Sequence, residues 1–197
     1  TLVLLEKFDE AITFSKDTWN KEDDIFEADL LIGINYFMRK DYIKAEQHFK
    51  RLNKISEYNI FFDNFIGNIL MAWTEAAKKN ENKAFSLLEE IPKKYSNLEQ
   101  VQNIFLHCHF DSSETKKKFN NLINSKEYDF SRYNFFLANY LLSINKVEEA
   151  KKIIFESSKK HNSNLLLKQT RDFLINNNIS KIEKVFDCKS PKDTLAE

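Results

Sequence analysis

Apolar side chains recur along this chain at the three- and four-residue spacing of amphipathic helices. In residues 26–40, Leu30 and Ile34 share one face, and such a stripe is what a surface helix turns toward a core. Residues 41–52 follow at once, with Phe49 on a second apolar face. Two amphipathic helices joined by a couple of residues must fold back on each other. The pattern therefore predicts an antiparallel helix hairpin.

The same periodicity continues over most of the chain. It predicts helices at about 2–17, 22–39, 41–53, 58–79, 81–91, 97–110, 113–125, 130–144, 146–160 and 164–176, then a short helix near 180–187 and the start of another at 191. Two segments, Asn176–Asn178 and Asp187–Pro191, carry the residues that favour flexible connections.

Glycine and proline are rare, with 2 of each in 197 residues, against the ~14 and ~10 of average usage. A β-sandwich or barrel makes many tight turns with these residues, and nucleotide-binding loops need several glycines together. These classes are therefore excluded. The composition predicts an all-α protein.

A small residue recurs in the second helix of each predicted hairpin. These small residues, called anchors below, are Ala11, Ala45, Ala84, Thr115 and Ala150, at intervals of 34, 39, 31 and 35 residues. In three copies another small residue lies twelve positions upstream, namely Gly33, Ala72 and Ala138. Short side chains at a crossing let two helix axes come within packing distance. A helix pair repeated about every 34 residues predicts a helical solenoid.

The first full copy of this pattern resembles the tetratricopeptide repeat family, whose first helix carries Trp, Leu-Gly and Tyr and whose second carries Ala-x3-Phe. Those positions hold Ile32-Gly33, Tyr36, Ala45 and Phe49, with Asp29 where the Trp would stand. Weaker copies hold Met71-Ala72, Ala84 and Leu88, then Leu137-Ala138, Leu141, Ala150 and Ile154, while the stretch with Thr115 and Phe119 matches only in its second helix. The resemblance covers most of residues 1–160. It implies a tetratricopeptide-like α-α superhelix, a divergent segment of a longer bacterial repeat protein.

We expect the repeat array to cover residues 1–176, with 177–197 as an extension leading into a further, truncated repeat. Ser190, Pro191 and Asp193 are typical of a helix start that the chain does not finish, so the natural protein is expected to continue. Three sequences fit capping boxes at helix starts: Ser96 with Glu99, Asn145 with Glu148, and Ser180 with Glu183.

The cluster His107-Cys108-His109 is the one that could suggest a metal site. Consecutive helical residues point about 100° apart, so we expect a core cysteine between two partly buried histidines. Cys108 as a nucleophile would need a base such as His48 or His161 through a tertiary contact. Adjacent acids fit a solvated helix face better than a catalytic pair. We therefore expect no catalytic residue, metal or cofactor, and no enzyme activity in this segment.

Charge also limits the partners. The 30 basic and 30 acidic residues balance to a net charge of zero, and only four of the basic residues are arginines. Neither fact favours a nucleic-acid partner. No apolar run reaches about 18 residues, so we expect no membrane insertion. Two cysteines, Cys108 and Cys188, do not decide between cytoplasm and periplasm.

The resemblance also implies a partner-binding surface, because first helices line the concave face of such arrays. By position, the residues on that face are Leu30, Ile34, Phe37, Ile69, Trp73, Phe135 and Asn139. The family's charged grooves use Lys and Asn where Leu30 and Ile34 stand here, so a clamp for a peptide carboxylate is not expected. An apolar groove with a Trp suits an amphipathic helix. The alternative is that these side chains pack against the next turn of the solenoid itself.

The leading hypothesis is a non-catalytic scaffold that binds a protein or peptide in a concave, largely apolar groove. Self-association through uncapped repeat ends is a further expectation. Two alternatives remain: an RNA-binding helical repeat, and a helical accessory domain of an enzyme whose catalytic part lies outside this segment.

Overall fold

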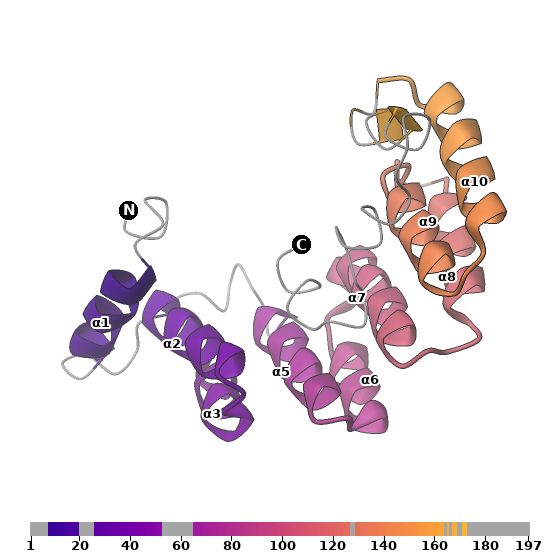
Figure 1. The fold of residues 1–197 in the computed structure, drawn as a ribbon. Coiled ribbons are helices and arrows are strands. Elements are labelled where there is room, and N and C mark those ends of the chain that lie inside the picture. Colours follow the sequence, from indigo (N-terminus) through magenta and orange to yellow (C-terminus); the bar gives the residue numbers. More distant parts are fainter. Residues whose placement is uncertain are drawn as a thin grey trace. The chain divides into compact units, whose positions relative to one another are not determined.

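The chain is described by a computed structural model over residues 8–19, 26–52, 65–126, 129–163, 165, 167–168 and 171–172. Within these ranges it is helical and has no strand, which confirms the all-α prediction (Figure 1). The helices are α1 (Phe8–Trp19), α2 (Phe26–Met38), α3 (Tyr42–Leu52), α5 (Phe65–Ala77), α6 (Glu81–Glu89), α7 (Ser96–His109), α8 (Thr115–Ile123), α9 (Tyr133–Ser143) and α10 (Val147–Lys160). The helices expected near 180 and 191, and the two flexible segments, lie outside the described residues.

The chain divides into two compact units, Thr1–Gln102 and Asn103–Glu197. The division falls inside α7. Each unit is built from helix hairpins. That these hairpins form one continuous array over residues 1–176 remains a prediction. None of the helices in the described ranges is long and apolar enough to cross a membrane.

The hairpins share one turn. Four described residues other than glycine have a left-handed backbone, and they are Lys40, Lys79, Asp111 and Asn145, with φ of 63°, 64°, 55° and 65°. Each follows the first helix of a pair. The Lys40 N–H donates to the Phe37 carbonyl at 2.9 Å and the Asp41 N–H to the Tyr36 carbonyl at 2.9 Å. The same two bonds recur at Lys79, Asp111 and Asn145, which makes each turn a Schellman motif.

The residue after the left-handed one starts the next helix in three of these turns. The carbonyls of Asp41, Asn80 and Lys146 accept the N–H groups of Ala45, Ala84 and Ala150, each at 3.0 Å. Only three residues therefore separate one helix from the next, which forces the chain back on itself.

Two of the predicted capping boxes are wrong. Asn145 ends α9 in a left-handed conformation, which asparagine tolerates, and Lys146 stands at the N-cap of α10 without a side-chain bond. Ser96 has right-handed helical angles, because the 3-10 turn Lys93–Tyr95 runs directly into α7. The box at Ser180 lies outside the described residues.

The predicted anchors form the core. Ala45, Ala84, Thr115 and Ala150 are fully buried, and so are the residues four positions later, Phe49, Leu88, Phe119 and Ile154. The small residues upstream lie where the hairpins close: a Cβ built on Gly33 would be 2.5 Å from Phe49 Cε1. Ala72 and Ala138 are buried as well. The inferred reason for small residues at these crossings is thus confirmed directly in the α2–α3 hairpin.

Aromatic rings fill the core of the second unit. Phe105 on α7 packs against Phe119 on α8 and against Tyr133 and Phe136 on α9, with ring centroids 5.4 to 6.3 Å apart. Helix α9 is buried over nearly its whole surface, as expected of a helix that is apolar all round.

Candidate functional site

The residues predicted to line a concave face fall into two groups. Leu30 and Ile34 on α2 and Ile69 on α5 are half-buried, so part of each apolar side chain is accessible. Four others lie in the interior, and they are Phe37, Trp73, Phe135 and Asn139. For these four the structure favours the packing alternative over direct partner contact.

Trp73 is an interior anchor. It is fully buried, and its Nε1–H donates to Gln102 Oε1 on α7 at 2.7 Å. The indole is thereby both enclosed and satisfied, as buried tryptophans usually are. This bond connects α5 to α7 within the first unit.

Asn139 on α9 has a different environment. Its Nδ2 donates to the Phe135 carbonyl one turn earlier at 2.9 Å. Its Oδ1 is buried and has no hydrogen-bond partner in the described part of the chain. An unsatisfied buried acceptor costs stability, so the side-chain oxygen of Asn139 lowers the stability of the fold at this position.

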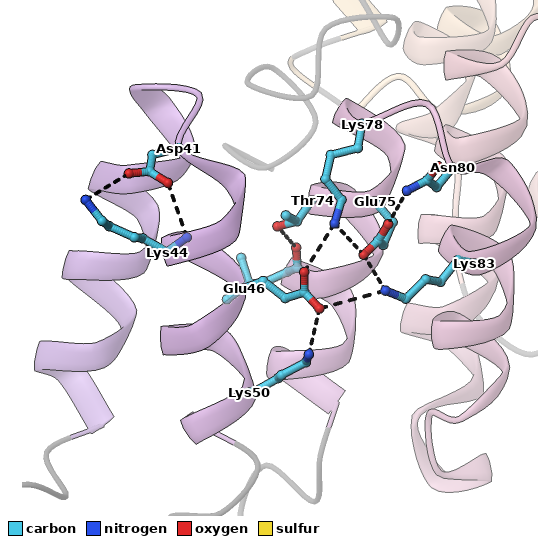
Figure 2. Close-up of polar contacts among 10 residues, drawn as sticks. Asp41, Lys44, Glu46, Lys50, Thr74, Glu75, Lys78, Asn80 and Lys83 are labelled. Carbon is cyan, nitrogen blue, oxygen red and sulfur yellow. Dashed lines mark hydrogen bonds and ion pairs between the residues drawn. The ribbon is translucent and has the colours of Figure 1, made fainter.

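A dense polar site among the described residues is the Glu75 cluster, formed by Glu46, Lys50, Glu75, Lys78, Asn80 and Lys83 (Figure 2). It draws on α3, α5 and α6 and on the turn between the last two. Glu75 is almost completely buried. Its Oε1 accepts from Lys78 Nζ at 2.7 Å and Lys83 Nζ at 2.6 Å, and its Oε2 accepts from Asn80 Nδ2 at 2.7 Å.

Glu46 joins this cluster from α3. It pairs with Lys50 at 2.7 Å, with Lys78 at 3.2 Å and with Lys83 at 3.8 Å. Lys78 thus bridges both glutamates, and the cluster links the α2–α3 hairpin to the α5–α6 hairpin. Charge is shared among three lysines and two carboxylates.

Protonation in the cluster follows from these contacts. Burial by itself would raise the pKa of Glu75, but the hydrogen bonds from Lys78, Lys83 and Asn80 outweigh burial and lower the pKa to about 2. For Lys78, burial lowers the pKa, and the hydrogen bonds to Glu75 and Glu46 raise it above its ordinary value overall. Glu75 and Lys78 are therefore both charged at neutral pH. A carboxylate held this firmly as an anion is a poor general acid or base.

A second buried carboxylate lies inside the α2–α3 hairpin. Asp29 is fully buried and contacts His48 Nδ1 at 2.7 Å and Arg51 Nε at 3.1 Å. The His48 ring stacks on Tyr36 with centroids 5.7 Å apart. The polar contacts of Asp29 with His48 and Arg51 therefore hold the two helices of this hairpin together.

The His107-Cys108-His109 sequence does not gather into a metal site among the described residues, where no group of three or more potential ligands is found. Cys108 is fully buried and disulfide-bonded, so its sulfur is not a thiolate nucleophile. His48 is engaged with Asp29. His161 lies elsewhere, on the rim of a hollow at the end of α10.

That hollow has a volume of about 570 Å³ and lies in the second unit. Its walls come from the ends of α8 and α10 and the start of α9, with charges of both signs from Lys126, Asp129, Glu156 and Lys160. The Ser131 backbone N–H donates to Asp129 Oδ1 at 2.9 Å, and this bond lowers the pKa of Asp129. The carboxylate is thus engaged by its own loop.

The periodic pattern of the sequence predicts the apolar positions but neither polar cluster. The one available signal was the presence of Asp29 and Glu75 at positions of helical faces that otherwise read as apolar. The partners of Asp29 lie 19 and 22 residues away along the chain. In the Glu75 cluster, Lys78 and Glu46 are 32 residues apart, so spacing alone could not pair these residues. No family model, curated protein or solved structure matches this chain.

Proposed function

We propose that the chain is a tetratricopeptide-like helical scaffold without catalytic activity, and that it binds a protein or peptide partner on the face formed by the first helices of its hairpins. The observation that carries this proposal is the repeated hairpin: one turn geometry, with a buried anchor in the second helix of each pair. Repeats of this kind bury a core between neighbours and leave an extended face for recognition.

Apolar accessibility supports the choice of face. Leu30 and Ile34 lie one turn apart on α2, and both are half-buried, as is Ile69 on α5. Partly exposed aliphatic side chains on successive first helices suit the apolar stripe of an amphipathic helix. The buried side chains of Trp73 and Phe37 would support this face by fixing the positions of α5 and α2.

Polar chemistry supports recognition over catalysis. The buried carboxylates Asp29 and Glu75 each hold two or more donors. Such saturated groups stabilise hairpins and offer no unpaired acid or base to a substrate.

Photo-crosslinking tests the proposal in the full chain. A photoreactive residue replaces Ile34 on the proposed face or, as the matched control, Ile43, which is 72% exposed on α3. We expect protein adducts from position 34 and none from position 43 in a lysate of the source organism, with unchanged circular dichroism.

The outcomes separate the alternatives. Equal adducts from both positions, or none from position 34, would contradict the assigned face. Adducts at position 34 that are removed by ribonuclease would favour an RNA partner and overturn the protein-binding proposal.

A further inference from the structure

Two ion pairs occupy equivalent positions in the repeats. In the first unit, Glu46 comes directly after the anchor Ala45, and Lys83 comes directly before the anchor Ala84. Their charged atoms are 3.8 Å apart, and Figure 2 shows the contact spanning α3 and α6. The pair thus joins the second helix of one hairpin to the second helix of the next.

The second unit has the same arrangement. Lys116 comes directly after the anchor Thr115, and Glu149 comes directly before the anchor Ala150. Lys116 Nζ pairs with Glu149 Oε1, which joins α8 to α10. The side chains are 40% and 35% exposed, so this is a partly solvated contact at the edge of the interface.

The two pairs have opposite polarity. The position after the anchor is acidic in α3 and basic in α8, and the position before the next anchor is basic in α6 and acidic in α10. Both junctions therefore match internally, whereas Glu46 would repel Glu149 and Lys116 would repel Lys83 if hairpins were exchanged.

We propose that these two positions form a charge code on the second helices, which selects the neighbouring hairpin and fixes its register. Partly exposed pairs add little net stability, but like charges brought together are penalised, so such pairs discriminate between partners. Coiled coils use charged positions beside their apolar seam in the same way.

Register is selected by the same means in the first unit. Lys50 lies one turn along α3 from Glu46, and a one-turn slip moves a helix by about 5.4 Å. Lys83 would then face Lys50 in place of Glu46. The apolar anchors alone would not oppose such a slip as strongly, because neighbouring turns of a helix offer similar packing surfaces.

The α8–α10 junction provides the cleaner test. Four variants of the full chain are compared by thermal unfolding: Lys116→Glu, Glu149→Lys, the exchanged double variant with both changes, and the neutral double variant Lys116→Gln/Glu149→Gln. Each single variant should lower the melting temperature by about 2–4 °C. The exchanged and neutral double variants should both stay within about 1 °C of the original chain.

A control on the same helix isolates the junction. Lys117 is 71% exposed and pairs locally, with Glu114 three residues earlier. Lys117→Glu makes the same change in net charge as Lys116→Glu, at the neighbouring position. It should shift the melting temperature by less than Lys116→Glu.

The proposal fails under three results. It is wrong if Lys116→Glu and Glu149→Lys leave the melting temperature unchanged, or if the exchanged double variant does not recover. It is also wrong if the neutral double variant falls as far as the single variants, because the pair would then contribute stability and no selection.

Discussion

The ring of Phe49 on α3 fills the space beside Gly33 on α2 where any larger side chain would begin. A Cβ at Gly33 would lie 2.5 Å from Phe49 Cε1, 2.8 Å from Phe49 Cδ1 and 3.2 Å from His48 Cβ. Phe49 is fully buried, so its ring has little room to move away. The contact sets how closely the two helices of this hairpin approach.

Gly33→Ala should therefore destabilise the protein, although alanine is the better helix former. The substitution gains about 1 kcal/mol from helix propensity, and overpacking costs about 1–3 kcal/mol. We expect a net loss in urea unfolding. The double variant Gly33→Ala/Phe49→Leu should be at least as stable as Phe49→Leu alone, because the smaller side chain makes room. If Gly33→Ala raises the free energy of unfolding, the close contact is not limiting.

Acid should weaken the Glu75 cluster. The folded pKa of Glu75 is lowered from 4.5 to about 2, so between these values the unfolded state binds more protons. The contribution of Glu75 to stability is complete above about pH 4.5 and is lost as the pH falls toward about 2. Urea unfolding from pH 7 to pH 3 would measure this loss.

Glu75→Gln gives the matching substitution. It removes the charge that Lys78 and Lys83 contact, and we expect a loss of about 2 kcal/mol at pH 7. The variant should also lose less stability on acidification than the original chain. Glu89→Gln, on the exposed face of α6, is the control and should change neither quantity appreciably. Parallel acid profiles for Glu75→Gln and the original chain would contradict the assignment.

Trp73 should respond to substitution as a core residue. Trp73→Ala should cost about 3–5 kcal/mol, so loss of partner binding in that variant would not identify a contact surface. Trp73→Phe keeps most of the buried ring and should cost less. The remaining loss, about 1–3 kcal/mol, arises because Gln102 Oε1 is left without its donor. Adding Gln102→Leu should restore part of that loss, since both polar partners are then gone. No recovery in the double variant would show that the bond contributes little.

The shared turn predicts a stabilising change. Lys79 has φ of 64°, a conformation that costs an ordinary side chain about 1–2 kcal/mol and costs glycine almost nothing. Lys79→Gly should raise the free energy of unfolding by about 0.5–1 kcal/mol after the entropy of the unfolded chain is counted. Asn145→Gly is the matched control, with φ of 65°. It should gain less, because asparagine already tolerates this conformation. A loss of stability in Lys79→Gly would argue against the Schellman geometry.

Local sequence signals predicted the helices well and their ends less well. Predicted segments at 41–53, 81–91 and 146–160 correspond to α3, α6 and α10. The capping prediction failed at Asn145, because asparagine suits both a helix start and a left-handed helix end. The N–H groups of Asn145 and Lys146 donate back to the carbonyls of Leu142 and Leu141, and these bonds make Asn145 a helix end.

The candidate site could be predicted only in outline. Leu30, Ile34 and Ile69 were identified from their positions in the repeat and are half-buried as a contact surface requires. Trp73 and Phe135 have the same kind of position and are buried. Periodicity gives the direction of a side chain from its own helix, but exposure depends on whether a second helix covers that direction.

The sequence by itself determined the all-α class, the hairpin spacing and the anchors, because each depends on residues within one helix or one turn. Tertiary structure alone decided which apolar positions are covered and which basic side chains pair with Glu75 and Asp29. Those outcomes depend on side chains brought together from separate helices, such as Lys83 with Glu75 and Arg51 with Asp29. Charge pairing acts through space at a few ångströms, so it becomes visible only once the helices are packed.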